Sequence, residues 1–282
     1  MPYDSFSNNK LAAFKSKETS LTDIVGTDAI FLFSSGKEII HHLMNKLGVT
    51  RKDEVYISTS SNSSFVSSCV TSTIFNYCRP SRVITDNTKA LFVIHEFGYP
   101  NKEIEKLVEI SKKKNIPLIE DTAHTLNSWY LGKRLGSFGD VSLISLPKSF
   151  PVTSGGVFIV NNSNYYPENF SKNEKTSLEI QRLVKYLDAF TAKKRQIVEL
   201  YQHELSKYEI LYDYNSNINP FVYGFKHSKS ESLNQFLQKK GIQVARTYVD
   251  CNVLLPVNPF MSIDDVKYCT DLIAKHLEYD KT

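Results

Sequence analysis

Short apolar runs alternate with amphipathic stretches through the first 160 residues, and this alternation constrains the fold more than any other feature. Runs rich in β-forming residues predict strands at 29–33, 55–57, 90–94, 117–119, 141–146 and 157–160. The stretches between them predict helices at 37–47 and 102–114. Strands separated by helices indicate an α/β fold with a mostly parallel sheet flanked by helices.

The pattern changes after Asn161-Asn-Ser-Asn164. Beyond this point the sequence predicts a long helix at 177–207, then a strand and further helices at 231–240 and 263–277. We therefore expect a large domain over residues 1–162, followed over residues 163–282 by the long helix and a smaller α+β C-terminal domain.

Composition narrows the class of protein. With 34 basic and 30 acidic residues the net charge is only +4, which gives no indication of nucleic-acid binding but suits an anionic small substrate. The longest apolar runs are too short to cross a bilayer, and the first ten residues lack the apolar core of a signal peptide. The four cysteines form no C-x-x-C pair, so we expect a reduced, cytoplasmic setting and no metal site.

Two groups of residues could carry chemistry. Ser34-Ser-Gly36-Lys37 joins a predicted strand to a predicted helix, where free amides favour a phosphate, although a simple helix cap has the same pattern. Asp121 ends a predicted strand and is followed by His124, Lys148 and the pair Gly155-Gly156. A pyridoxal phosphate (PLP) site needs such a lysine and such a carboxylate, but surface and turn residues give the same pattern, so the flanking sequence decides.

The flanking sequence resembles the DegT/DnrJ-type sugar aminotransferases, which are fold-type-I PLP enzymes acting on nucleotide-linked keto sugars. The resemblance extends from Phe31 to Val160, with a closing segment at 255–266. It is carried by Lys52-Asp-Glu-Val55, Thr88-Lys-Ala90, Val93-Ile-His95, Gly98-Tyr-Pro100, Ile119-Glu-Asp-Thr-Ala-His124, Gly132-Lys-Arg-Leu-Gly-Ser-Phe-Gly-Asp140, Ser145, Lys148 and Gly155-Gly156.

The resemblance implies a role for each matched residue. Lys148, seven residues before Gly155, would be the Schiff-base lysine, and Asp121 would pair with the ring nitrogen. His124 would lie over the ring or near its hydroxyl. The phosphate would be held around the loop at the start of the predicted helix and near the lysine, by Ser35, Gly36, Lys37 and Ser145.

The sequence departs from the family pattern in three places. The spacing from Ser145 to Lys148 is shorter than usual. The position of the ring-stacking aromatic falls on Asn62, so the nearest aromatic, Phe65, takes that role in our prediction. The G-x-N-x-R stretch that reaches a neighbouring subunit is missing after Asn162.

From the resemblance we expect a PLP-dependent aminotransferase of nucleotide-sugar metabolism, serving surface polysaccharide, with glutamate as the amino donor and a homodimer as the assembly. The alternative is a diverged relative that binds PLP or a sugar nucleotide without transaminase activity. Sugar dehydration on the same scaffold is a smaller rival, and Lys148 argues against it because those enzymes replace the lysine.

Overall fold

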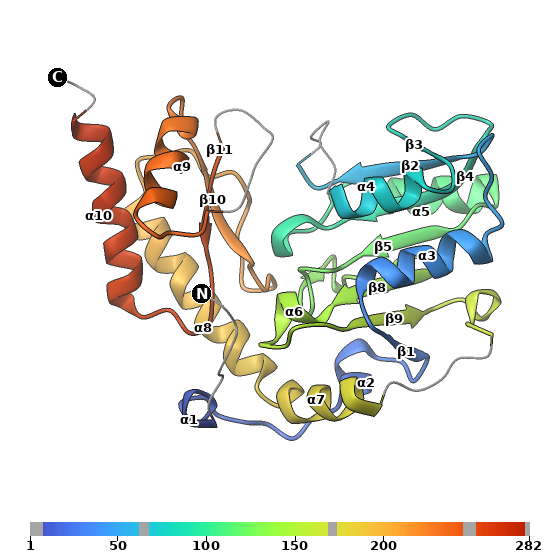
Figure 1. Ribbon diagram of the computed structural model, residues 1–282, viewed down its shortest axis with the longest axis horizontal. Helices are drawn as coiled ribbons and strands as arrows, with labels where there is room; N and C mark the ends of the chain where they lie inside the picture. Colours follow the sequence, from blue (N-terminus) through green and yellow to red (C-terminus); the bar gives the residue numbers. More distant parts are fainter. Residues whose placement is uncertain (1–7, 62–67, 169–173, 245–251, 280–282) are drawn as a thin grey trace.

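The computed structural model describes residues 8–61, 68–168, 174–244 and 252–279. A seven-stranded sheet forms its larger lobe (Figure 1). Its strands are β1 (Ile30–Phe33), β2 (Glu54–Thr59), β3 (Arg79–Ser81), β4 (Thr88–Ile94), β5 (Leu118–Asp121), β8 (Val141–Ser145) and β9 (Gly156–Val160). In space their order is β1-β9-β8-β5-β4-β2-β3.

The sheet is mostly parallel, as the sequence predicts. β3, β2, β4, β5 and β8 run parallel to one another, whereas β9 runs antiparallel to both β1 and β8. The reversal of β9 was not predicted. Because β9 is reversed, its first residue lies at the same edge of the sheet as the last residues of β1, β5 and β8.

Helices cover both faces of this sheet. α3 (Gly36–Lys46) buries Ile39, Ile40, Leu43 and Met44 on one stripe, and it shares a core on the first face with α4 (Ser68–Phe75). The second face packs against α5 (Ile104–Lys114) and, beside β9, against α2 (Leu21–Val25) and α7 (Glu174–Val184). Shorter elements are α1 (Asn8–Leu11), η1 (Glu96–Gly98), the hairpin β6 (Trp129–Tyr130) and β7 (Lys133–Arg134), α6 (Leu146–Ser149) and η2 (Ser163–Tyr165).

The prediction of one long helix at 177–207 is wrong in one respect, because this stretch forms two helices, α7 and α8 (Leu187–Glu204). At the break the carbonyl of Lys185 accepts a hydrogen bond from the N–H of Lys17, 2.9 Å away. The Lys185 carbonyl is thus paired with a distant segment and not with an N–H of the following helix, which is consistent with a turn at this point. None of the helices in the described part of the chain is long and apolar enough to span a bilayer.

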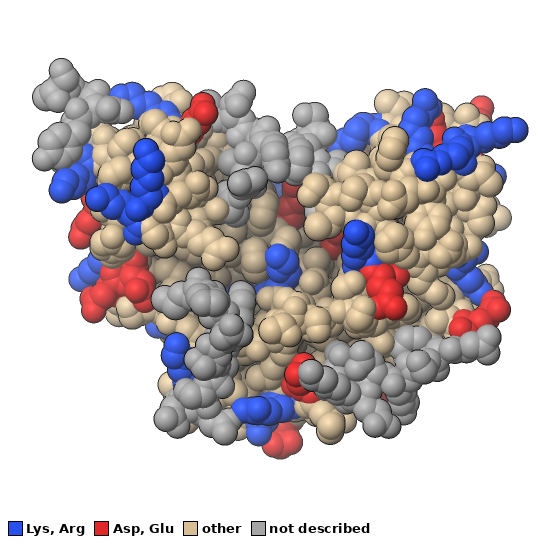
Figure 2. Space-filling model, viewed as in Figure 1, with Lys and Arg blue, Asp and Glu red and all other residues tan. Residues whose placement is uncertain are grey.

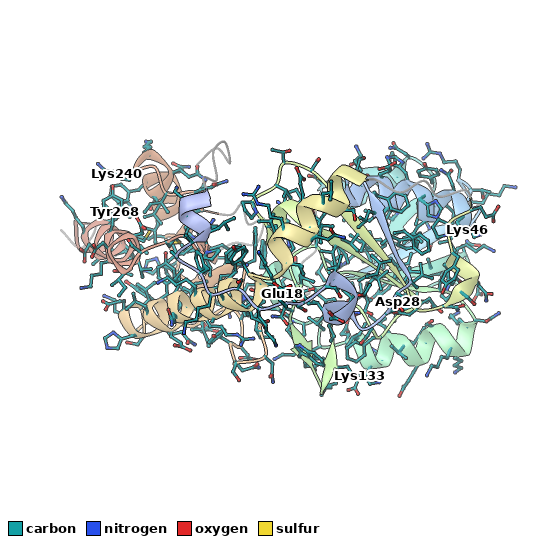
Figure 3. All side chains as sticks on the ribbon, turned by 90° about the horizontal axis from the view of Figure 1, so that it is seen from below. Glu18, Asp28, Lys46, Lys133, Lys240 and Tyr268 are labelled. Carbon is teal, nitrogen blue, oxygen red and sulfur yellow. The ribbon has the colours of Figure 1, made fainter. Side chains whose placement is uncertain are left out.

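The smaller lobe pairs β10 (Val222–Lys226) with β11 (Asn252–Pro256) in an antiparallel sheet. α9 (Ser230–Lys239), α10 (Ile263–Tyr279) and the second half of α8 pack around it in a separate hydrophobic core. The first half of α8 packs on the larger lobe, which favours a division within α8, later than the predicted boundary after residue 162. Figure 3 places Lys240 and Tyr268 at one end of the molecule and Lys46 at the other, so the lobes lie side by side.

Candidate active site

Gly156, the first residue of β9, joins two loops at the edge of the sheet where β1 and β8 end. It pairs with Ser145 at the end of β8 and with Phe33 at the end of β1. A Cβ atom on Gly156 would lie 2.6 Å from the carbonyl carbon of Ser35 and 2.8 Å from the nitrogen of Gly36, so only glycine permits this approach. The structure thereby brings three of the predicted phosphate-binding residues to one place: Ser35, Gly36 and Ser145.

The amino end of α3 is closed by its own side chains. Ser35 Oγ accepts a hydrogen bond from the N–H of Glu38 at 3.2 Å. The Glu38 carboxylate accepts from the N–H of Ser34 at 2.8 Å and from its hydroxyl at 2.6 Å. Lys37 is exposed and forms no ion pair with a described residue. A phosphate at this helix end would be favoured by the helix dipole, but the Glu38 carboxylate would be its neighbour.

Asp121 ends β5 as a buried carboxyl group, with 5% of its surface exposed. One oxygen accepts a hydrogen bond from the N–H of Ala123 at 2.9 Å, and no described residue donates to the other. Burial raises the pKa of Asp121 to about 6, against the lowering effects of the Ala123 hydrogen bond and of nearby His95. A cation in front of the free oxygen would compensate for the burial, which suits a protonated ring nitrogen.

The residue before it, Glu120, is fully buried and has a structural role that the sequence did not indicate. His95 Nδ1 accepts from the N–H of Asn101, so Nε2 carries the proton and donates to Glu120 at 3.0 Å. The other donors to Glu120 are backbone N–H groups at 2.7–2.8 Å, from Gly136, Phe138 and Gly139. Glu120 therefore ties the Gly132–Asp140 segment to β4 and β5.

His124 lies between two aromatic rings, and no sequence motif marked either of them as part of the site. Its ring stacks on that of Phe97, with 5.6 Å between the ring centroids, and its centroid lies 4.4 Å from that of Phe221. The N–H of Phe221 donates a hydrogen bond to the carbonyl of Phe97 at 2.8 Å. Phe97 has a φ of 55°, a left-handed conformation rare for a bulky residue. Burial, together with the charges of Lys148 and Lys194, lowers the pKa of His124 to about 3, so the ring is neutral.

Lys148 lies in α6, the single turn that follows β8. The turn is closed at its base, because the N–H of Leu146 donates to the carbonyl of Gly155 at 3.0 Å. The Lys148 side chain is exposed, and its Nζ lies 5.8 Å from the centroid of the Phe221 ring. Phe221 precedes β10, so the lysine and His124 face the junction between the lobes. Figure 2 shows the surface hollowed between the lobes, with basic and acidic side chains visible in the hollow.

Phe65, the predicted ring-stacking residue, and Asn62 both lie outside the described residues. Within the part of the chain that the structure does describe, no group of three or more His, Cys, Asp or Glu residues could hold a metal ion. The ring of His41 on α3 bonds instead to the hydroxyl of Tyr77 at 2.9 Å.

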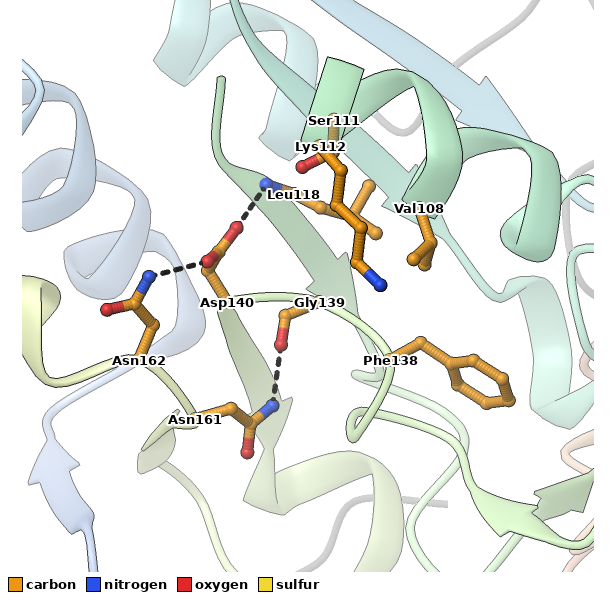
Figure 4. A pocket seen from close by; sticks show the side chains of 9 residues that line it. All are labelled: Val108, Ser111, Lys112, Leu118, Phe138, Gly139, Asp140, Asn161 and Asn162. Carbon is orange, nitrogen blue, oxygen red and sulfur yellow. Dashed lines mark hydrogen bonds between the residues drawn. The ribbon is translucent and has the colours of Figure 1, made fainter. Parts of the chain in front are cut away.

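A second pocket, of about 140 Å³, lies at the opposite edge of the sheet (Figure 4). Its Asp140, Asn161 and Asn162 side chains are already hydrogen-bonded within the fold: Asp140 accepts from the N–H of Leu118 at 2.9 Å and from Asn162 Nδ2 at 2.8 Å. Asn161 donates to the carbonyl of Gly139 at 2.9 Å. None of the predicted site residues lines this pocket, so its geometry does not compete with the candidate site.

Comparison with known proteins decides the family. The model of the DegT/DnrJ/EryC1/StrS aminotransferase family matches residues 9–170, more than half of the chain. The chain belongs to this family. The matched region contains Asp121, His124 and Lys148, together with the loop at Ser35 and Gly36.

Curated relatives of the family match only part of this chain. GDP-perosamine synthase of Escherichia coli O157:H7 is 30% identical over 148 residues, which cover 47% of this chain and 40% of the relative. A Campylobacter jejuni UDP-4-amino-4,6-dideoxy-N-acetyl-beta-L-altrosamine transaminase is 37% identical over 86 residues, covering 29% and 23%. The chain thus matches less than half the length of these relatives.

Solved structures of this class match the whole fold. An aminotransferase from Psychrobacter cryohalolentis has a TM-score of 0.80 at 14% identity, covering 100% of both chains. The Helicobacter pylori aminotransferase PseC has a TM-score of 0.78 at 17% identity, covering 98% of this chain and 97% of its own. At such identities the likeness concerns the fold, and it confirms the predicted PLP-transferase-like α/β architecture.

Proposed function

We propose that this protein is a PLP-dependent aminotransferase that transfers the amino group of glutamate to a nucleotide-linked keto sugar, in amino-sugar synthesis for surface polysaccharide. Family membership supports the reaction class, and the names of the relatives support a GDP- or UDP-linked sugar. A Streptococcus pneumoniae chain described as a sugar aminotransferase, with a TM-score of 0.72, is known in a PLP form. The observation that carries the proposal is the buried Asp121 carboxyl, one oxygen of which receives no donor from the described residues.

The residues at this edge fit the cofactor. PLP, when bound, supplies an electron sink that makes the hydrogen next to an amino nitrogen acidic. Asp121 would hold the ring nitrogen protonated, because each charge favours the ionised form of the other. Lys148 would carry the cofactor through its Nζ and, once released, would move the proton as a base and then as an acid. Neutral His124 would pack on the ring without adding charge.

One observation favours the alternative, a diverged relative without transaminase activity. The Glu38 carboxylate lies at the amino end of α3, where the proposal places the phosphate, and accepts the two hydrogen bonds that Ser34 donates. For a phosphate to bind there with full strength, Glu38 must turn away or be neutralised by a nearby cation such as Lys37.

Lys148→Ala tests the proposal directly. Wild-type protein incubated with PLP should show a band at about 420 nm that borohydride fixes on one lysine, a general property of PLP enzymes. Lys148→Ala should lose this band. Lys133→Ala should keep it, because Lys133 is an exposed residue of the β6–β7 hairpin (Figure 3). Mass spectrometry should find the reduced adduct on Lys148. A colourless wild type would support the diverged relative instead.

We also propose a two-fold symmetric homodimer with the sites near the interface, since closed two-fold dimers are the commonest homo-oligomers. Light scattering at micromolar concentration should give twice the 32.2 kDa chain mass. A monomeric mass would contradict the proposal. A cytoplasmic location is consistent with the three cysteines in the described ranges, Cys69, Cys78 and Cys269, which are all free thiols.

A further inference from the structure

Lys194 is a buried lysine at the place where the two lobes meet. Only 4% of its surface is exposed. It lies on the inner stripe of α8 between Phe190, which belongs to the core of the larger lobe, and Ile197, which belongs to the core of the smaller lobe. The helix therefore carries the Lys194 ammonium group into the junction instead of into solvent.

No described residue compensates for this charge. Lys194 forms neither a salt bridge nor a hydrogen bond with any residue in the described ranges, in contrast to the exposed lysines Lys102 and Lys226, which pair with Asp213 at 2.5 Å and Glu209 at 2.6 Å. Lysines are almost never fully buried unless they are paired, because an isolated ammonium loses its hydration without compensation. The site is thus built as one half of an ion pair.

The segment that follows His124 also reaches this junction. Asn127 Nδ2 bonds to Thr191 Oγ1 at 3.4 Å, one turn before Lys194, which brings the segment after His124 against α8. In this segment the hydroxyl of Thr125 is buried and bonds to no described residue. An ammonium group such as that of Lys194 is a donor of the kind that a carboxylate requires.

Lys194 is also close to the predicted reaction centre. Thr191, one turn before Lys194 on α8, bonds to Asn127, which stands three residues after His124. In agreement with this contact, the pKa of His124 is lowered by burial first, and then by the charges of Lys148 and Lys194. Burial lowers the pKa of Lys194 itself to about 8, so that the group is still charged at neutral pH. The charges of two lysines, one on α6 and one on α8, thus act on the same imidazole.

We propose that Lys194 binds the α-carboxylate of the amino-acid donor. This inference rests on the proposed function, in which the donor nitrogen reacts where Lys148 holds the cofactor. The α-carboxylate is attached to the carbon that bears that nitrogen, so it must be accommodated close to Lys148 and His124. A nucleotide sugar carries its negative charge on the diphosphate, away from the keto carbon, and the cofactor phosphate is assigned to the loop at Ser35 and Gly36.

Lys194→Met tests the assignment in the PLP-loaded protein. Its affinity for L-glutamate, measured by spectral titration, should fall at least about tenfold while the band at about 420 nm is kept. The sharper measurement compares the affinities for L-glutamate and for its α-amide, isoglutamine. Wild type should bind glutamate at least about tenfold more tightly than isoglutamine. Lys194→Met should bind the two with similar affinity, because the ammonium group that distinguishes a carboxylate from an amide is gone, as in a double-mutant cycle. Lys193→Met, at a partly exposed neighbour on the same helix, should behave as wild type.

Stability separates this role from a structural one. Removing an unpaired buried charge should leave the Tm of Lys194→Met equal to or above that of wild type, and Lys194→Gln provides a second variant that keeps polarity. A lower Tm for both variants would mean that the lysine is paired within the fold, and an unchanged preference for glutamate over isoglutamine in Lys194→Met would also overturn the assignment.

The outcome is distinguishable from failure of the proposed function. If wild type does not bind PLP, the proposed function is wrong. The carboxylate site can then still be tested in the cofactor-free protein. Glutarate at about 50 mM should then raise the Tm of wild type and of Lys193→Met but not that of Lys194→Met, because a ligand stabilises only the state that binds it. Absence of a shift in wild type would refute the carboxylate site.

Discussion

Replacing Glu120 with alanine is expected to lower the free energy of unfolding by about 3–5 kcal/mol. The carboxylate accepts hydrogen bonds from three backbone N–H groups and from His95. Alanine would leave all four donors buried without an acceptor. Urea unfolding of the cofactor-free protein at neutral pH measures the change.

Glu105→Ala is the matched control, because Glu105 is exposed on α5 and should change the stability by less than about 0.5 kcal/mol. Glu120→Gln should fall between the two, since an amide can accept on one side but presents a second donor on the other. If the free energy of unfolding of Glu120→Ala were within about 1 kcal/mol of the wild-type value, the hydrogen bonds to Glu120 would not be what fixes the Gly132–Asp140 segment.

Asp121→Asn is expected to stabilise the cofactor-free protein at pH 7 by about 3 kcal/mol. The folded pKa of about 6 lies above the ordinary value of 3.8, so the folded state holds the proton more tightly than the unfolded state. The stability of wild type therefore falls as the pH rises from 3.8 to 6, and the full cost is present above that window. Asparagine carries no charge and keeps the acceptor for the N–H of Ala123.

The free energies of unfolding of wild type and Asp121→Asn, measured from about pH 4 to about pH 7.5, should become similar toward pH 4. An asparagine variant less stable than wild type at pH 7 would mean that the fold itself pairs Asp121. With PLP bound, the same variant should lose at least about tenfold in turnover, a barrier of about 1.4 kcal/mol, because an amide cannot hold the ring nitrogen protonated. Opposite effects on stability and turnover would distinguish a functional carboxylate from a structural one.

The sequence predicted every strand of the sheet except β3, because buried strands such as β4 and β9 contain continuous apolar runs. It did not predict the direction of β9, since side-chain alternation is the same for a strand run either way. The break between α7 and α8 was also missed. At this break the Lys185 carbonyl bonds to the N–H of Lys17, a contact between distant segments that no local pattern contains.

The candidate site was predictable only where a motif marked it. Asp121 and Lys148 come from the family pattern, and the Ser35-x-x-Glu38 spacing is a helix-capping signal that could have revealed Glu38. Lys194, in contrast, belongs to Lys193-Lys194-Arg195, which in sequence is indistinguishable from a solvated helix face. Its burial arises from packing between the lobes, so only the structure identifies it.

The reversal of β9 has a consequence for how this chain can evolve. Two parallel strands must be joined by a crossover of a dozen or more residues, but β8 and β9 are antiparallel neighbours, so the segment that bears Lys148 is a hairpin loop fastened at both ends to adjacent strands. Residues can be gained or lost inside such a loop without shifting the register of the sheet, and each change alters only the reach of the lysine. The spacing from Ser145 to Lys148 lies within this loop, so a change in its length would alter the position of the lysine while the paired strands stay in register.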